Sequence, residues 1–268
     1  MSISVASLDL ALRQLRQRRP LVHAISNLVS LTPVANALLA LGATPVMAHA
    51  EVEVAEITGA ADALLLNLGT LEPAREAAMQ RALARAAARA IPVVLDPVGV
   101  GASEYRRAVA LALLQQAPVT LIRGNASEIR ALAGETATAR GVDSLEASTA
   151  ALAAARELAA RHARVVVVSG TRDLLIHREA ELAVANGHPL MARVTAMGCI
   201  ASALCAAFAA VDPQPLRAAA HAMACMGLAG ELAMQEAVGP GSLAVGFVDA
   251  LYALEGPRLA GLRAAPLG

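Results

Sequence analysis

Residues 92–128 read PVVLDPVGVGASEYRRAVALALLQQAPVTLIRGNASE, which contains a complete unit of strand, helix and strand. Two short apolar runs, Pro92–Leu95 and Val119–Ile122, flank a helical pattern over Glu104–Gln116. Continuously apolar runs are typical of strands buried on both faces, and two strands joined through a helix lie parallel. This stretch therefore predicts a parallel sheet covered by helices.

The same alternation of short apolar runs and alanine-rich helical patterns extends along the chain in both directions. We expect further strands at Leu21–Ile25, Thr44–Met47, Ala63–Leu68, Val165–Ser169, Leu174–His177 and Pro189–Val194. We expect further helices at Leu8–Arg18, Thr32–Leu41, Pro73–Arg89, Ser127–Ala133, Leu145–Arg161, Gly198–Ala210 and Pro215–Ala237. Gly134–Ser144 is expected to be a surface excursion and Gly256–Gly268 to fray. No shift in composition marks a boundary, so residues 1–268 are predicted to form a single α/β domain.

The composition excludes several classes of function. All 22 basic residues are arginine, because the chain contains no lysine. A Walker A loop, a protein-kinase fold and a Schiff-base enzyme each need a lysine, so none of them fits. The 22 acidic residues bring the net charge to zero, and aromatic residues make up 1% of the chain. A nucleic-acid binder needs basic surface and stacking platforms, so no nucleic-acid partner is expected.

Cysteine usage and hydropathy indicate the compartment. The three cysteines form no CxxC pair, which argues against a zinc site and against a disulfide framework. The first 20 residues lack the apolar core of a signal peptide. Residues 21–50 and 194–211 are uncharged, but the first stretch contains His, Asn and Pro, and the second consists largely of small residues. Neither is typical of a membrane span, so we expect a cytoplasmic protein without a membrane partner.

Polar residues follow several predicted strands, where open α/β sheets bind their ligands. Asp96 comes directly after Leu95 and before a proline and two glycines, where its carboxylate could meet a cation or hydroxyl, or could cap the loop's own amides. Arg123 and Glu128 follow the next strand, so a cation and an anion project into one crevice, as for a polyphosphate with its magnesium. Asn125 is more typical of a helix cap.

Two more strand ends carry candidate groups. Ser169 and Gly170 follow four valines, where they would let a ligand approach the backbone or would form a tight turn between strands. Cys199 lies in the first turn of an apolar helix, whose free N–H groups form an anion site and whose dipole should lower the thiol pKa. We interpret Cys205 and Cys225 as buried structural thiols.

The N-terminal strand ends predict a weakly polar wall for a small neutral ligand. Asn27 and Met47 stand at these ends, whereas His23 and His49 are interpreted as structural histidines. In the helix over Pro73–Arg89, four arginines lie largely along one face, which we interpret as solvated: Arg75, Arg81, Arg85 and Arg89.

These features together resemble the hydroxyethylthiazole kinase family of the ribokinase-like superfamily. The resemblance is carried in register by PLVHAISN (20–27), ANALLALGATPVMAHA (35–50), LNLGTL (66–71), PVVLDPVGVGAS (92–103), IRGNASEI (122–129), NGHPLMARVTAMGC (186–199) and GPGS (239–242). It implies a three-layer αβα sandwich with a mostly parallel central sheet. It also implies transfer of the ATP γ-phosphate to the primary hydroxyl of 4-methyl-5-(2-hydroxyethyl)thiazole for thiamin salvage, with Mg²⁺ as cofactor.

The resemblance also implies roles for single residues. Met47 and the backbone amide of Ala196 would contact the thiazole, with Asn27 a weaker candidate. Arg123 and Ser169 would bind ATP. Asp96 and Glu128 would organise magnesium and its waters. Cys199 would occupy the position at which related sugar kinases have their base. Members of the family form homotrimers with active sites between subunits.

The chain departs from the family pattern in ways that bear on substrate breadth. It has Ala196-Met197-Gly198-Cys199 where the family usually has Gly-Ala-Gly-Cys, and a Cβ at residue 196 is tolerated only if φ is negative there. It also has Ser169-Gly170 for Thr-Gly, and Asn27-Leu28 for Asn-Asn.

Three alternatives stay open. One is a kinase of the same fold acting on another small alcohol, such as hydroxymethylpyrimidine. Another is a thiol hydrolase in which Cys199 is paired with His221 or His188. The third is a protein that binds thiazole or ATP without catalysis.

Overall fold

The computed structural model describes residues 2–135 and 148–267, and a nine-stranded sheet runs through its centre in the order β2-β1-β3-β4-β5-β6-β7-β8-β9. Its strands are β1 (Leu21–Ile25), β2 (Thr44–Val46), β3 (Ala63–Asn67), β4 (Val93–Asp96), β5 (Val119–Asn125), β6 (Ala163–Ser169), β7 (Asp173–His177), β8 (Glu181–Val184) and β9 (Ala264–Pro266). The strands from β2 to β6 in that order pair in parallel, and β7, β8 and β9 are added antiparallel.

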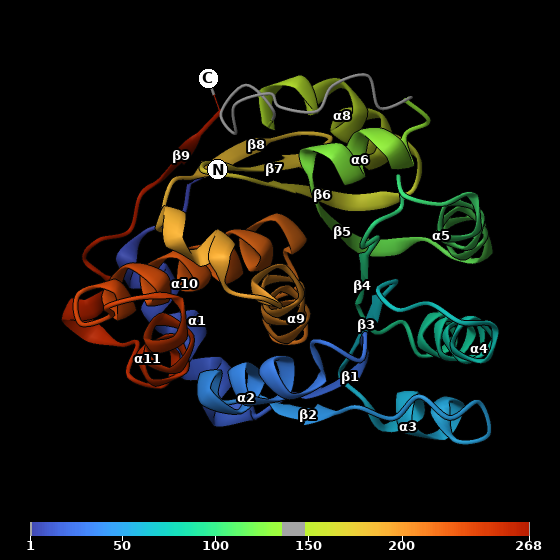
Figure 1. The fold of residues 1–268 in the computed structure, drawn as a ribbon, viewed down its shortest axis with the longest axis horizontal. Helices are drawn as coiled ribbons and strands as arrows, with labels where there is room; N and C mark the ends of the chain where they lie inside the picture. Colours follow the sequence, from blue (N-terminus) through green and yellow to red (C-terminus); the bar gives the residue numbers. More distant parts are fainter. Residues whose placement is uncertain (1, 136–147, 268) are drawn as a thin grey trace.

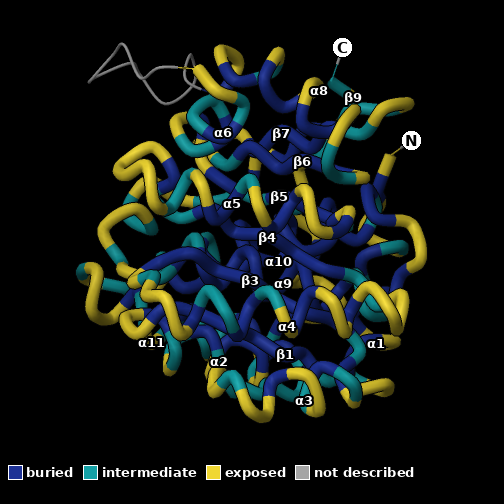
Figure 2. Tube along the Cα trace, turned by 90° about the vertical axis from the view of Figure 1, so that its right-hand side faces the viewer, coloured by how far each residue is buried: buried dark blue, intermediate teal, exposed yellow. Residues whose placement is uncertain are grey.

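Helices cover both faces of the sheet (Figure 1). One face packs against α1 (Val5–Arg18), α2 (Leu31–Leu41), α9 (Met197–Ala209), α10 (Pro215–Met234) and α11 (Pro240–Tyr252). The other packs against α3 (Val54–Ala60), α4 (Pro73–Arg89), α5 (Glu104–Gln116), α6 (Ala126–Leu132) and α8 (Leu152–Arg161). The central strands are dark blue in Figure 2, which marks them as buried. The predicted three-layer αβα sandwich with a mostly parallel sheet is therefore confirmed.

The apolar runs predicted the parallel strands and the antiparallel strand β7 within a few residues, but they failed beyond β7. Pro189–Val194, predicted as a strand, is the 3₁₀ helix η1 (Pro189–Arg193). His188 caps it, and Met191 lies so close to Gly230 of α10 that a Cβ there would come within 2.2 Å of the sulfur. Four further elements were not predicted from the sequence: β8, β9, α3 and α11.

The C-terminal tail is ordered, contrary to expectation. The 3₁₀ helix η2 (Gly256–Leu259) is followed by β9, which pairs antiparallel with β8. Arg263 anchors the strand, because its backbone N–H donates to Asn186 and its side chain donates to the carbonyl of Ala185. Most of the predicted excursion at residues 134–144, and the first three residues of the helix predicted over Leu145–Arg161, lie outside the described residues.

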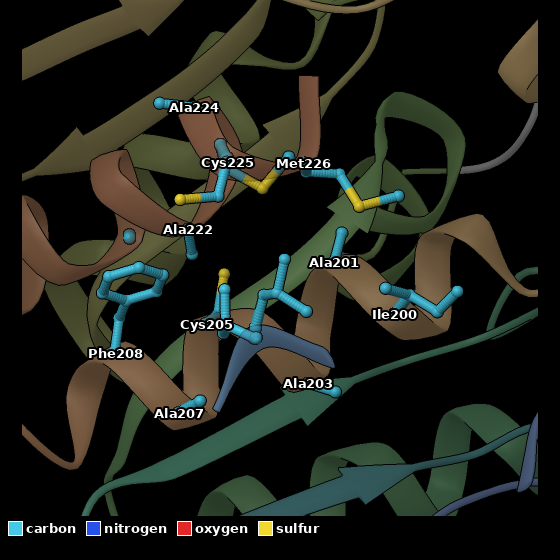
Figure 3. Close-up of a cluster of buried hydrophobic side chains, with 14 of the residues drawn as sticks. Ile200, Ala201, Ala203, Cys205, Ala207, Phe208, Ala222, Ala224, Cys225 and Met226 are labelled. Carbon is cyan, nitrogen blue, oxygen red and sulfur yellow. The ribbon is translucent and has the colours of Figure 1, made fainter. Parts of the chain in front are cut away.

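The centre of one layer is the contact between α9 and α10, drawn in Figure 3. Phe208 and Cys205 from α9 and Cys225 from α10 are fully buried there. Burial raises the pKa of the Cys205 thiol to about 12 and also raises the pKa of Cys225. Both are therefore structural thiols, as predicted.

Arg75 contradicts the prediction of a wholly solvated arginine face on α4. Its side chain is buried, and its guanidinium donates to the carbonyl of Ser26 (3.2 Å) and to the hydroxyl of Thr70 (3.1 Å). The helical period could not reveal this, because the loops at Ser26 and Thr70 cover the first turn of the helix. Arg81, Arg85 and Arg89 are exposed as expected.

No helix of the described residues is both long enough and apolar enough to span a bilayer.

Candidate active site

The predicted site residues gather at one edge of the sheet, where the parallel strands have their carboxyl ends. Asn67 at the end of β3 stands opposite Asp96 at the end of β4. Asn125 at the end of β5 stands opposite Ser169 at the end of β6. Parallel pairing places side chains from distant parts of the chain side by side at this edge.

Asp96 is a fully buried carboxylate with one free oxygen. Its Oδ2 accepts a hydrogen bond of 2.6 Å from the side-chain amide of Asn67, whereas its buried Oδ1 has no partner with hydrogen-bond geometry within the described residues. The Ser202 hydroxyl, which donates to the carbonyl of Gly198, is nevertheless close enough to lower the pKa of the Asp96 carboxyl. Burial raises the pKa of Asp96 to about 7, and nearby Arg123 acts in the opposite direction. The bonded oxygen of Asp96 contacts the side chain of Asn67 instead of a backbone N–H of its own loop, so the carboxylate does not simply cap that loop. The other oxygen, Oδ1, is available to a ligand.

Cys199 lies in the same cluster. Its sulfur receives side-chain N–H groups from Asn27 and Asn67, each at 3.3 Å. Burial raises the thiol pKa, and the charge of Asp96 raises it further, while the hydroxyl of Ser30 and the two amides act in the opposite direction. The expectation of a pKa lowered by the helix dipole is therefore wrong, because desolvation of a 9% exposed thiol outweighs the dipole.

Asn27 uses its amide for local structure. Its nitrogen donates to Asn67 (2.9 Å) and to Cys199, and its oxygen accepts the backbone N–H groups of Val29 and Ser30. These four bonds occupy all the positions that an asparagine amide offers. Asn27 therefore supports the loop and the thiol, and a polar contact with substrate would have to replace one of these bonds.

Arg123 brings positive charge to this edge. Its Nη2 donates to the hydroxyl of Ser169 at 2.7 Å, and its buried Nε has no partner among the residues described. Its Nη1 lies against the first turn of α9, so close that a Cβ at Gly198 would come within 2.7 Å of it. The guanidinium and the N-terminus of α9 therefore face the same space.

The turn after Ser169 carries a second buried carboxylate. Asp173 accepts the backbone N–H of Gly170 at 3.0 Å and thereby closes the turn between β6 and β7. Burial raises the pKa of Asp173 to about 7, and the positive charge of Arg123 acts against this shift. The predicted tight turn is confirmed, and the Ser169 hydroxyl in it also binds Arg123.

Glu128 belongs to a capping box. Its Oε1 accepts the N–H of Gly99 (3.0 Å) and its Oε2 accepts the N–H of Asn125 (2.9 Å), while the Asn125 side chain accepts the N–H of Glu128. Asn125 is thus the helix cap that the sequence predicted. The carboxylate of Glu128 is close enough to raise the pKa of Asp96, so the two acidic groups share one region.

The helix α9 begins with an unusual residue. Ala196, its N-cap, has φ +67° and ψ −1°, a left-handed conformation, so the condition of a negative φ is not met. Met197, which stands where the family usually has alanine, packs in the core and is 9% exposed, so its side chain does not cover the helix N-terminus. Because η1 precedes α9, the predicted anion site at the start of this helix follows a 3₁₀ helix instead of a strand.

The ends of the N-terminal strands β1 and β2 lie at the same edge of the sheet. Met47 follows β2 directly and packs half-buried against the core. His23 is structural, because its ring bonds Thr58 and the carbonyl of Ala48, and burial lowers its pKa. His49 is exposed.

A divalent cation with oxygen ligands fits the acidic residues of this edge. The unpartnered Oδ1 of Asp96 can bind one, and each carboxylate oxygen of Glu128 retains a lone pair beside its amide partner. Within the part of the chain that is described, no three acidic, histidine or cysteine side chains form a metal-binding group. Waters and phosphates would therefore complete the coordination, as is usual for Mg²⁺.

The hydrolase alternative finds no support in this geometry. Ring nitrogens of His221 and His188 bond Ser7 and the N–H of Leu190, respectively. None of the described hydrogen-bond partners of Cys199 is a histidine. A thiol nucleophile would lack its base.

Comparison with known proteins gives consistent matches. A model of the "Hydroxyethylthiazole kinase family" matches residues 12–256. Proteins named "Hydroxyethylthiazole kinase" from Syntrophus aciditrophicus (53% identical, covering 91% of each chain) and Granulibacter bethesdensis (54% identical, covering 90% of this chain and 88% of the relative) are similar over most of their length.

Solved structures give the same result. The structure of a hydroxyethylthiazole kinase protein from Pyrococcus horikoshii superposes with a TM-score of 0.89 at 38% identity, covering 97% of this chain and 99% of that one. An ADP complex of Bacillus subtilis pyridoxal kinase superposes with a TM-score of 0.60 at 16% identity, covering 81% of this chain and 91% of that one, a likeness of fold alone.

Proposed function

This chain belongs to the hydroxyethylthiazole kinase family, and we propose on that premise how its own residues transfer phosphate to the hydroxyl of 4-methyl-5-(2-hydroxyethyl)thiazole. One observation carries the proposal: the Arg123 guanidinium lies against Gly198 at the N-terminus of α9, and the buried Asp96 and Cys199 share the Asn67 amide at the same edge. Phosphoryl transfer needs mainly alignment and charge neutralisation, which a cation, free N–H groups and a metal-binding carboxylate supply.

The nucleotide phosphates bind on the side of β5 and β6. Arg123 and Ser169 hold them, and the guanidinium supplies charge that other kinases take from lysine. The free N–H groups at the start of α9 surround the phosphoryl group in transit. Asp96 and Glu128 hold Mg²⁺, largely through its waters, and the ion neutralises phosphate charge when it is bound.

The thiazole binds on the side of β1 and β2. Met47 contacts the ring, and the backbone N–H of Ala196 contacts a polar atom of the substrate, while Asn27 shapes the wall. Cys199 stands beside the acceptor hydroxyl. Because burial raises its pKa, the thiol is protonated at neutral pH, and the loose transition state of phosphoryl transfer makes little demand on a base.

A homotrimer with sites between subunits is part of the proposal. Leu28 and Val29, which directly follow Asn27, are 61% and 60% exposed, and Leu39 on α2 is also exposed. Apolar side chains beside the thiazole site would be covered by a second subunit. Sedimentation equilibrium at several concentrations tests this, and a monomer at micromolar concentration would contradict it. The three unpaired cysteines and the use of ATP favour a cytoplasmic location.

The activity is tested by ADP release with Mg²⁺-ATP in the presence and absence of the thiazole alcohol. We expect release to depend on the alcohol, with the phosphate ester as product. A panel including hydroxymethylpyrimidine measures breadth. Activity only with another alcohol would replace the substrate assignment, and binding without turnover would favour a silent binding protein.

A further inference from the structure

Asn67 occupies the centre of the site although the sequence motifs gave it no role. It is the last residue of β3 and is fully buried. Its oxygen accepts the N–H groups of Asn27 (2.9 Å) and Gly69 (3.0 Å). Its nitrogen donates to Asp96 Oδ2 (2.6 Å) and lies 3.3 Å from the sulfur of Cys199. One amide thus contacts the groups proposed for metal binding, for the acceptor hydroxyl and for the substrate wall.

We propose that Asn67 is a positioning residue that holds Asp96 and Cys199 in fixed relation, so that the bound metal and the acceptor hydroxyl are aligned. This inference rests on the proposed function. The bond that Asn67 donates occupies Oδ2 and leaves Oδ1 as the carboxylate oxygen without a hydrogen-bond partner in the described structure. A side chain that orients a metal-binding carboxylate typically changes metal affinity or activity by about 10–100-fold when it is removed.

The same amide restricts the thiol. Asn67 and Asn27 both direct N–H groups at the sulfur, so the rotation of the Cys199 side chain is limited from two sides. Asn67 is the member of this pair that also bonds Asp96, and its own nitrogen is held by both partners. A displacement of its amide would therefore move both Asp96 and Cys199. Because these residues face the metal and the acceptor hydroxyl, the reacting groups would be misaligned and kcat would fall.

The test is Asn67→Ser. A serine hydroxyl can still accept the N–H of Gly69 and preserve the turn, but it is too short to reach Asp96 or Cys199. We expect kcat to fall about 10–100-fold and the calorimetric Kd of Mg²⁺ for the ADP-bound protein to rise about tenfold. The Kd of ADP in EDTA should change less than about twofold, because Arg123 and Ser169 are untouched.

The matched control is Asn186→Ser. Asn186 is also buried, donates to Glu231 and to the carbonyl of Gly261, and accepts the N–H of Arg263, all away from the site. It should lower thermal stability without changing the Mg²⁺ affinity or kcat of the folded protein. Asn67→Ala, which leaves Gly69 as well as Asn27 without an acceptor, supplies a second variant with a larger expected loss of stability.

A purely structural role predicts a different result. Asn67→Ser would then lower only the melting temperature, and unchanged Mg²⁺ affinity with unchanged kcat per folded molecule would overturn the proposal. An equal loss of ADP affinity in EDTA would overturn it too, since this would show general disruption of the site. If the wild-type protein fails to phosphorylate the thiazole alcohol, the kinase assignment fails, but the Mg²⁺ titration still decides the role of Asn67.

Discussion

Ala196 is an alanine in a conformation that favours glycine. A left-handed φ places Cβ close to the following carbonyl, which costs about 1–2 kcal/mol for a residue other than glycine. We predict that Ala196→Gly raises the free energy of unfolding by about 1 kcal/mol, because relief of this strain outweighs the added entropy of the unfolded glycine. Urea unfolding measures the change, and thiazole phosphorylation should persist because the residue keeps its N–H.

Ala90→Gly is the matched control for this effect. Ala90, the C-cap of α4, also has a positive φ (53°) and lies at the opposite end of β4 from Asp96, before the strand begins. It should gain a similar stability. Stabilisation at Ala90 without stabilisation at Ala196 would mean that the Cβ at Ala196 makes a favourable contact, and a change in alcohol specificity there would indicate contact with substrate.

The positions of single site residues could be predicted where one strand end decides them, and not where several loops meet. Asp96, Arg123 and Ser169 were found because each follows an apolar run. Asn67 lies within the strand predicted over Ala63–Leu68, and its role emerges only from the pairing of β3 with β4 and from its contact with Cys199 of the distant helix α9. The raised pKa of Cys199 depends on the depth of burial, which a helical position does not reveal.

At the scale of elements, the start of α9 and the end of β5 are in tight contact. A Cβ on Gly198 would lie 2.7 Å from Nη1 of Arg123. Because this atom is the far end of a flexible side chain, Gly198→Ala should fold but displace the guanidinium from Ser169. The displaced guanidinium would also lose a hydrogen bond to the phosphates of ATP. A hydrogen bond to a charged group is worth about 1.5 kcal/mol, so we predict a rise of about tenfold in the KM for ATP.

Gly246→Ala provides the comparison within another helix. A Cβ there would meet Ala233 at 3.5 Å, an ordinary contact, so stability should stay the same or rise by up to about 1 kcal/mol with KM unchanged. If Gly198→Ala leaves the KM for ATP unchanged while keeping its melting temperature, Arg123 does not bind the nucleotide in the position proposed.

Elements were predictable from sequence where burial is two-sided. The central parallel strands are largely apolar and buried, and the long helices repeat with a clear period. The strand β8 has only four residues and begins with a glutamate, and the edge strand β9 ends in a proline, so neither gives a run that stands out. Both depend on partners brought together by the fold, as does η1 against α10.

At the scale of the whole molecule, buried carboxyl groups and buried imidazoles contribute to the free energy of unfolding in ways that change oppositely with pH. Asp173 has its pKa raised from 3.8 to about 7, so the folded state keeps a proton that the unfolded state releases between these values. Its contribution is present below pH 3.8 and is lost as pH rises towards 7. His221 has its pKa lowered from 6.5 to about 4, chiefly by burial, so its contribution is present above pH 6.5 and is lost as pH falls towards 4.

These contributions overlap between pH 4.5 and 6.5, where they cancel. Asp96 adds to the first and His23 to the second, so two carboxyl groups oppose two imidazoles. We therefore predict that the free energy of unfolding without ligands changes less steeply with pH in this window than the carboxyl groups or the imidazoles alone would make it. Asp173→Asn should make it rise with pH, and His221→Gln should make it fall, each by up to about 1.4 kcal/mol per pH unit.

Urea unfolding at half-unit steps from pH 4.5 to 6.5 measures these slopes directly, and slopes remain informative even if a variant loses stability at every pH. Asp249→Asn, at an exposed position of α11, should follow the wild type. Two variants whose curves run parallel to the wild type would contradict the cancellation, since neither group would then change its proton affinity on folding. Opposite slopes would show that Asp173, in the turn between β6 and β7, and His221, on α10, change their proton affinities in opposite directions when the protein folds.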